Sequence, residues 1–180
     1  MTRQIRNRRR ASAGFTLTEL IVTLAVASIL LGIAVPSFGS MMMSSRLTTQ
    51  ANDFVSAINF ARSEAIKRNR TISLCRTTSA SATACATSAA VWQHWIIRTG
   101  AGDVIRRGRV ETFGNSLQVS STLTNDQVAF GSDGLARTGT GLVADHQIRV
   151  CIASSGSANI RNVVMGAGSR LSTQTATGAC

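Results

Sequence analysis

The sequence of 180 residues is short of several residue types, and each shortage argues against a class of site. Tyrosine is absent and tryptophan occurs twice, so a broad aromatic platform for stacking single-stranded nucleic acid is not expected. Two histidines and the lack of a Cys-x-x-Cys pair argue against a zinc site. No glycine-rich phosphate loop precedes a helical pattern, which argues against a nucleotide-driven motor. The only proline is Pro36, so no proline interrupts a helix after it.

Acidic residues are also scarce, with 8 against 19 basic residues and a formal charge of +11. Five of the arginines lie within the first ten residues, and without them 14 basic and 8 acidic residues remain, a net charge of +6. A basic surface favours nucleic acid, anionic lipid or an acidic protein as partner, and the charge alone does not choose among them.

The residues from Phe15 to Val35 form an apolar run that contains a single charge, Glu19. As a helix this run would be roughly 31 Å long, the thickness of the hydrocarbon core of a bilayer. The arginines before it predict that the N-terminus stays in the cytoplasm and that the C-terminal part lies outside. A carboxylate within a bilayer is costly, so Glu19 is predicted to have a functional partner.

This N-terminus departs from three common types of targeting or anchoring segment. A secretory signal has an apolar core of about 7–15 residues followed by a small-residue cleavage site, whereas here Ala13 and Gly14 precede a longer run. A twin-arginine signal, suggested by Arg8-Arg9-Arg10, would need the same short, cleavable core. A plain membrane anchor explains the length of the run but leaves Glu19 without a role.

The segment Gly14-Phe15-Thr16-Leu17-Thr18-Glu19-Leu20 resembles the class III signal of type IV pilins and type II secretion pseudopilins. The resemblance implies that a prepilin peptidase cuts after Gly14 and that the new N-terminal residue, Phe15, is methylated. It also matches Glu19 to the glutamate that the family uses in assembly, and Pro36 to its helix-kinking proline. We therefore predict a subunit that is made in the inner membrane, with a periplasmic C-terminal domain, and that joins other pilins in a filament at the cell surface.

The chemistry of Glu19 agrees with this assignment. After cleavage, Phe15 would carry a free amine close to a carboxylate in a medium of low dielectric constant. Pairing of Glu19 with the amine of a neighbouring subunit would offset part of the cost of burying both charges. The hypothesis is that this pair sets the register of the helices during assembly.

The helical pattern continues beyond the apolar run. One apolar stripe recurs at steps of three and four residues, as in an amphipathic helix: Leu47, Ala51, Phe54, Ile58, Ala61 and Ala65. The pattern predicts one helix from Phe15 to about Arg70, with a kink or a locally unwound stretch near Pro36 to Gly39. The segment from Ala51 to Arg70 resembles the GspH/FimT branch of the family.

Short alternating runs separated by turn residues follow the helix and predict an antiparallel β domain packed on its amphipathic half. Strands are expected at residues 71–75, 91–98, 104–110, 117–121, 127–130, 147–152, 162–165 and 170–173, with turns at Ser132-Asp133-Gly134 and at residues 154–157. The predicted fold is therefore α+β and pilin-like. Its parts are a cleaved basic leader (1–14), a transmembrane helix (15–35), an amphipathic continuation (36–70) and a disulfide-bonded β domain (71–180).

Four cysteines after an exporting segment predict two disulfides in an oxidising compartment. Three connectivities are possible, and we favour Cys75–Cys85 and Cys151–Cys180. The first would close a loop rich in Ser, Thr and Ala, and the second would tie the last residue back to a strand. Each is typically worth about 2–4 kcal/mol.

No catalytic constellation stands out, so neither an enzymatic activity nor a cofactor or metal is predicted. Asp145 and His146 are adjacent, and neighbouring residues of a strand point to opposite faces, which suits a catalytic triad badly.

DNA is a further candidate partner. The resemblance extends to minor pilins of the FimT type, which are understood to bind DNA through a C-terminal Gly-Arg-x-Arg motif. Here the corresponding residues read Gly168-Ser169-Arg170-Leu171-Ser172, so Arg170 alone matches an arginine and Ser172 stands in place of the second. Phosphate contacts without base readout are expected, from the candidate set Arg106, Arg107, Arg109, Arg161 and Arg170. The predicted function is a structural or initiating minor pilin with DNA binding in natural transformation; the alternative is a pseudopilin of the GspH type in type II secretion.

Overall fold

A computed structural model describes residues 14–112, 116–139, 141–153 and 158–180. The basic leader up to residue 13 and the turn expected at residues 154–157 lie outside the described residues. The chain divides into two compact units, residues 1–39 and 40–180. Helix α1 (Leu17–Arg68) contributes residues to both units. It includes Pro36 to Gly39, so the locally unwound stretch considered there is not observed.

In the second unit α1 buries one face. All six residues of the predicted apolar stripe are buried there, which follows from their spacing because positions three and four apart lie on one side of a helix. Phe54 is at the centre of this face, and its ring meets the ring of Trp92 edge-on at 5.5 Å between centroids. On the opposite face of the helix, Asn52, Ser56 and Asn59 are exposed.

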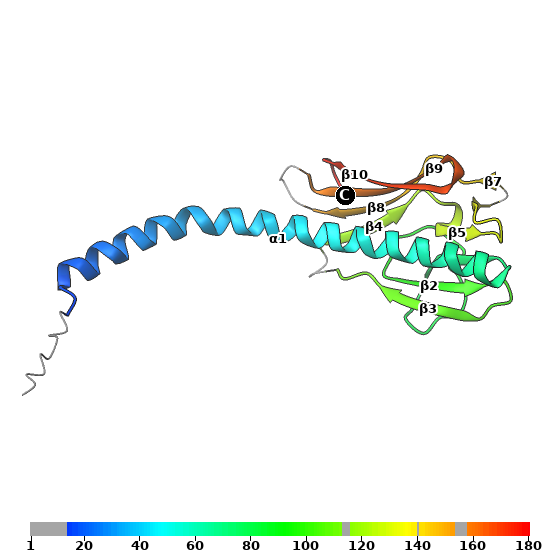
Figure 1. Ribbon diagram of the computed structural model, residues 1–180, viewed down its shortest axis with the longest axis horizontal. Coiled ribbons are helices and arrows are strands. Elements are labelled where there is room, and N and C mark those ends of the chain that lie inside the picture. The colour runs from blue at the N-terminus through cyan, green and yellow to red at the C-terminus, as the bar shows by residue number, and fades with distance from the viewer. Residues whose placement is uncertain (1–13, 113–115, 140, 154–157) are drawn as a thin grey trace, which may run out of the picture. The chain divides into compact units, whose positions relative to one another are not determined.

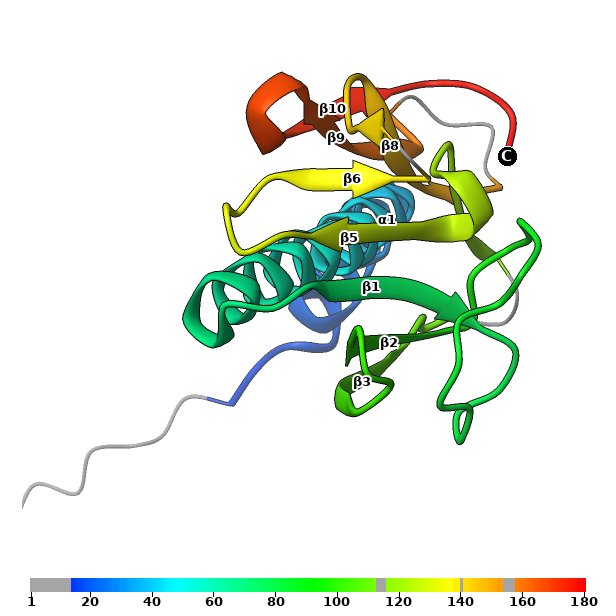
Figure 2. The ribbon, with the colours of Figure 1, turned by 90° about the vertical axis from the view of Figure 1, so that its right-hand side faces the viewer.

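The strands form two antiparallel sheets. The first has the order β3-β2-β1-β5-β6-β7 and the second the order β10-β9-β8-β4. Figure 1 shows the second half of α1 running along both sheets, and Figure 2 shows β3, β2, β1, β5 and β6 in this order from bottom to top. The strands are β1 (Ile72–Thr77), β2 (His94–Thr99), β3 (Val104–Arg109), β4 (Leu117–Ser121), β5 (Gln127–Phe130), β6 (Ala136–Thr138), β7 (Gly141–Leu142), β8 (His146–Ile152), β9 (Ile160–Gly166) and β10 (Arg170–Ala176).

A single hydrophobic core joins α1 to both sheets. It contains Phe54 from the helix, Leu74 and Phe130 from the first sheet, and Val150 and Val163 from the second. Every member of this core has a residue number of 47 or higher. The unit of residues 40–180 therefore holds its own complete core, and we expect it to fold without the N-terminal unit.

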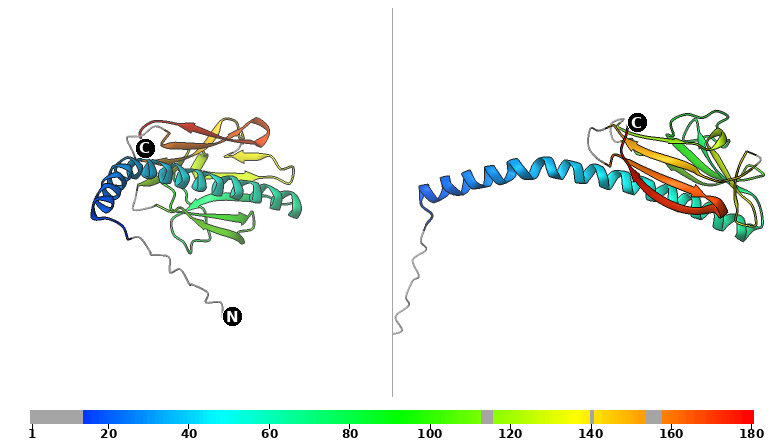
Figure 3. Two further views of the ribbon diagram at one scale, coloured as in Figure 1. Left: turned by 60° about the vertical axis from the view of Figure 1, so that its left-hand side comes forward. Right: turned by 90° about the horizontal axis from the view of Figure 1, so that it is seen from above.

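All eight predicted strands are present, most with boundaries shifted by one to three residues. β6 and β7 were not predicted. They have three and two residues, too few for an alternating pattern to emerge. The edge strand β10, red in Figure 3, is exposed along most of its length and pairs with β9 over seven residues without a shift in register.

Candidate functional site

The start of α1 is a capped helix end. Gly14 and Phe15 precede the helix, and the side chain of Phe15 is 84% exposed. The hydroxyl of Thr16 accepts a hydrogen bond from the backbone N–H of Glu19 at 3.2 Å, and its carbonyl accepts one from Leu20. Thr16 and Glu19 thus stand at the N-cap and N3 positions of a Thr-x-x-Glu capping box. The role of Thr16 was not predicted, although this spacing in the sequence would have revealed it.

Helix α1 exposes nearly every large apolar side chain of its first half that the structure describes. These are Leu17, Leu20, Ile21, Val22, Leu24, Val26, Ile29, Leu30, Leu31 and Ile33. A window of 18 residues in α1 has a mean hydropathy of 2.4, so the helix meets the criteria of length and composition for crossing a membrane. An apolar surface this large is typical of a segment that contacts lipid or other helices.

The three arginines of β3 each have a partner within the domain. The guanidinium of Arg106 lies 5.6 Å from the ring centre of Phe60 on α1 and 5.8 Å from that of Trp95. Arg107 donates to the carbonyl oxygens of Ala80 at 3.1 Å and Ala82 at 2.5 Å. Arg109 forms an ion pair with Glu111 at 2.8 Å. The β3 arginines therefore hold local structure as well as contributing charge.

The two arginines of the second sheet differ in exposure. Arg161 is only 9% exposed, and its guanidinium donates to the carbonyl oxygens of Ala158 and Ile160 and to the hydroxyl of Ser44. Arg170 is exposed and begins β10. The five arginines of the DNA-binding candidate set thus lie on two different sheets, and the structure does not bring them together as one cluster.

The turn before Arg170 is held by hydrogen bonds to β6 and to α1. Ser169 is buried; its hydroxyl accepts a hydrogen bond from the N–H of Ala136 at 2.6 Å, and its carbonyl accepts one from Arg62 on α1 at 3.3 Å. Gly168 has a φ of +69°, a conformation that favours glycine. Arg170 is therefore presented by an ordered turn beside α1, away from the β3 arginines.

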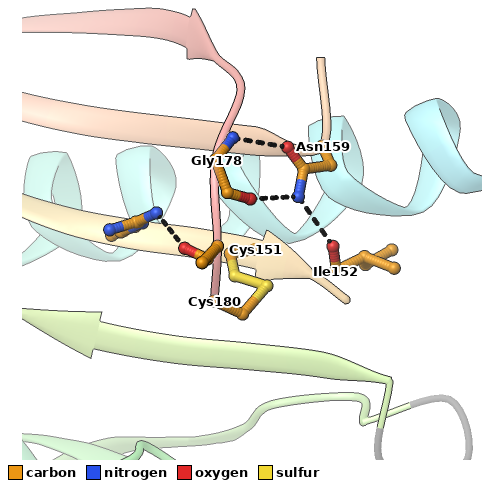
Figure 4. The surroundings of a disulfide bond; sticks show 7 residues. Cys151, Ile152, Asn159, Gly178 and Cys180 are labelled. Carbon is orange, nitrogen blue, oxygen red and sulfur yellow. Dashed lines mark hydrogen bonds between the residues drawn. A yellow bond between two sulfur atoms is a disulfide. The ribbon is translucent and has the colours of Figure 1, made fainter. Parts of the chain in front are cut away.

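The structure joins all four cysteines in the two pairs favoured from the sequence. Cys75–Cys85 closes the segment after β1 and Cys151–Cys180 ties the C-terminal residue to β8. Figure 4 shows the second bond beside Asn159, whose side chain exchanges two hydrogen bonds with Gly178 and donates a third to the carbonyl of Ile152. Within the described part of the chain, no group of three or more His, Cys, Asp or Glu side chains gathers as metal ligands.

A buried ion pair holds the segment between β1 and β2. Asp126 is 1% exposed and accepts hydrogen bonds from Arg76 Nε at 3.0 Å, the N–H of Ala90 at 2.8 Å and the hydroxyl of Ser121 at 2.7 Å. The same guanidinium also donates to the carbonyl of Ser88. This network, together with Cys75–Cys85, fixes a segment that has little regular structure of its own.

Two family models match the chain. The model of the type II transport protein GspH matches residues 50–168, and that of the prokaryotic N-terminal methylation motif matches residues 9–35. Type II secretion system protein H of Pseudomonas aeruginosa PAO1 is 41% identical over 61 residues, which are 34% of this chain and 36% of that protein. The match therefore spans about a third of the length of that relative.

Solved structures share the fold. Two crystal forms of the type IV minor pilin FimU of P. aeruginosa PAO1 give TM-scores of 0.53 and 0.55, at 17% and 16% identity. The two matches cover 74% and 76% of this chain, and 99% and 96% of the respective FimU chains. The minor pseudopilin EpsH from the type 2 secretion system of Vibrio cholerae gives a TM-score of 0.50 at 9% identity. This match covers 72% of this chain and 97% of EpsH. At such identities the likeness establishes the fold alone.

Proposed function

The chain belongs to the GspH family, whose members are minor pilins and pseudopilins, and from this premise we propose that it is a minor subunit of a type IV pilus. Its methylation motif implies processing by a prepilin peptidase and assembly with other pilins. In the proposal, the peptidase cuts after Gly14 and Phe15 becomes the methylated N-terminus. The helix anchors the subunit in the inner membrane, the β domain lies in the periplasm, and the subunit initiates or caps the filament.

The observation that carries this proposal is the chemistry of the first helical turn. Glu19 is the only charge in an exposed apolar segment, and it stands one turn from Phe15. An unpaired carboxylate in lipid is costly, and the free amine created by cleavage is a countercharge within reach of a neighbouring subunit. Thr16 supports this geometry by fixing where the helix begins.

Replacing Glu19 with glutamine is expected to abolish piliation while leaving the amount of chain in the membrane unchanged. The substitution removes the charge that the amine of a neighbouring subunit would meet, yet glutamine still suits the N3 position of a capping box. A deletion strain complemented with the wild type or with Glu19→Gln would be scored by electron microscopy of pili and by immunoblots of membrane fractions.

Asp53→Asn is the matched control, because Asp53 is exposed on the same helix and the same charge is lost. Normal piliation in the Glu19→Gln strain would contradict the proposed pairing. Normal piliation in the deletion strain itself would contradict a required role in the pilus.

A second candidate function is that of a pseudopilin in type II secretion. It is supported by the 41% identity to type II secretion system protein H. Measuring exoproteins in the medium of the same deletion strain distinguishes the two candidates. Loss of secretion with intact pili would replace the pilus proposal by this one.

DNA capture is a further property proposed for this subunit, and Arg170 is its main candidate contact. We expect residues 40–180 to bind double-stranded DNA with a strong dependence on salt and little dependence on sequence. Arg170→Ala is expected to weaken binding several-fold at low salt, whereas Arg109→Ala, which removes a guanidinium already paired with Glu111, should weaken it less. Fluorescence anisotropy at several salt concentrations is the measurement, and the absence of binding at low salt would exclude DNA capture by this domain.

A further inference from the structure

A pocket of about 360 Å³ opens where the end of α1 meets the turn between β5 and β6. Asn69 and Arg70 line it from the segment that follows the helix, Ser132 and Asp133 from the turn, and Arg137 from β6. The pocket is distinct from the N-terminal assembly segment and from the turn that presents Arg170. Its side-chain chemistry is dominated by hydrogen-bond donors.

Asp133, the acidic residue of the pocket, already has hydrogen-bond partners for its carboxylate. Asp133 binds Arg137 through both carboxylate oxygens, at 3.0 Å and 2.6 Å, and also accepts a hydrogen bond from the N–H of Leu135. The hydrogen bonds from Arg137, followed by that from Leu135, hold the pKa of Asp133 well below its usual range. Asp133 and Arg137 together therefore contribute no net charge, and Asp133 fixes the position of the guanidinium.

Gly131 lines the pocket beside the ion pair of Asp133 and Arg137. A Cβ atom at this position would lie 2.6 Å from Arg137 Nη1 and 2.7 Å from Asp133 Oδ1, so a larger residue would require the ends of these two side chains to shift. The glycine thus allows a close approach of these side chains, independently of its φ angle.

Arg70 supplies the uncompensated charge. The backbone N–H of Arg70 donates a hydrogen bond to the carbonyl of Ala65, and that of Asn69 donates one to the carbonyl of Ile66. Asn69 has a φ of +48°, and at this residue the chain leaves the helix. The position of Arg70 at the pocket is therefore set by the helix end. Among the described residues, none forms a hydrogen bond or ion pair with the Arg70 side chain.

We propose that this pocket binds one carboxylate, that of an acidic side chain on another subunit of the filament. The lining carries a net charge of +1, from Arg70, Arg137 and Asp133, which one carboxylate neutralises. Guanidinium groups pair with carboxylates through two parallel hydrogen bonds, and the hydroxyl of Ser132 and the amide of Asn69 add further donors. A group with two negative charges would leave the lining with a net charge of −1, beside the carboxylate of Asp133.

The inference depends on the proposed function only for the source of the carboxylate. The binding chemistry itself can be tested on the isolated chain, without a filament. Failure of the pocket and failure of the pilus proposal are therefore distinguishable.

The test is an NMR titration of the full chain in nonionic detergent, following the arginine Nε–Hε signals. The probes are the peptide acetyl-Gly-Glu-Gly-amide, the same peptide with glutamine in place of glutamate, and inorganic phosphate. We expect millimolar binding of the glutamate peptide, with shifts of the Arg70 signal, and at least about fivefold weaker binding to Arg70→Gln.

Lys67→Gln is the matched control, because it removes one positive charge from the same helix end outside the pocket. Its affinity for the glutamate peptide should stay within about twofold of wild type, since Lys67 is exposed and its ammonium already lies 3.8 Å from the carboxylate of Glu64. Equal binding of the glutamine peptide, equal effects of Arg70→Gln and Lys67→Gln, or tighter binding of phosphate would each overturn the proposal.

Discussion

Asp126→Ala is expected to lower the free energy of unfolding by about 3–5 kcal/mol, the typical cost of breaking a buried ion pair by removing one partner. The Arg76 side chain is 8% exposed and would be left in the interior without its countercharge. The substitution also removes the acceptor for the N–H of Ala90 and the hydroxyl of Ser121. A further cost arises because Asp126 has a φ of +52°, which alanine tolerates less well than aspartate.

Urea unfolding of residues 40–180, followed by circular dichroism, measures this effect. Asp126→Asn should cost less, since asparagine keeps an acceptor oxygen and tolerates the backbone conformation. The double variant Arg76→Met with Asp126→Ala should be more stable than Asp126→Ala alone, because no unpaired charge remains buried. Asp53→Ala, on the exposed face of α1, serves as the control. If Asp126→Ala lowered the free energy of unfolding by less than about 1 kcal/mol, the ion pair of Arg76 and Asp126 would not be important for stability.

Gly108→Ala is expected to destabilise the domain by about 1–3 kcal/mol through overpacking. A Cβ atom at residue 108 would lie 2.0 Å from Cζ2 and 2.1 Å from Cε2 of Trp95, whose residue is 5% exposed. The indole would have to move, and it is flanked by the Phe54 ring at 6.3 Å and the Arg106 guanidinium at 5.8 Å. A displaced ring would therefore change its contacts with Phe54 and Arg106.

The matched control is Gly166→Ala, because a Cβ atom there would meet no other atom within 4 Å. Thermal unfolding of the two variants of residues 40–180 gives the comparison, and tryptophan fluorescence reports whether the indole has moved. Equal melting temperatures for the two variants would show that the close packing of Trp95 on Gly108 does not contribute to the stability of the domain.

The secondary structure of this chain was largely predictable because it depends on local patterns. The stripe from Leu47 to Ala65 follows the helical period, and runs such as Gln127–Phe130 alternate. β6 and β7 escaped prediction because they depend on pairing with β5 and with each other rather than on a pattern of their own.

The burial and the partners of the polar side chains were less predictable, because these partners are distant in sequence. Arg161 is buried against Ser44, 117 residues away, and Asp126 pairs with Arg76 across 50 residues. The alternation of β3 predicts that Arg107 and Arg109 share a face, but it could not indicate that Arg107 binds the loop carbonyls. The pocket at Arg70 joins two segments about 60 residues apart, and no motif connects them.

The C-terminal end of the chain has a redundant attachment. Asn159 holds Gly178 through two hydrogen bonds, at 2.8 Å and 3.1 Å, and Arg149 donates to the carbonyl of Ala179. These bonds keep the tail beside β8 and β9 whether or not Cys151 and Cys180 are joined. The disulfide therefore acts chiefly on the unfolded chain, where it closes a loop of 29 residues and lowers the conformational entropy that folding must overcome. Reduction should accordingly leave the folded tail in place and make global unfolding easier.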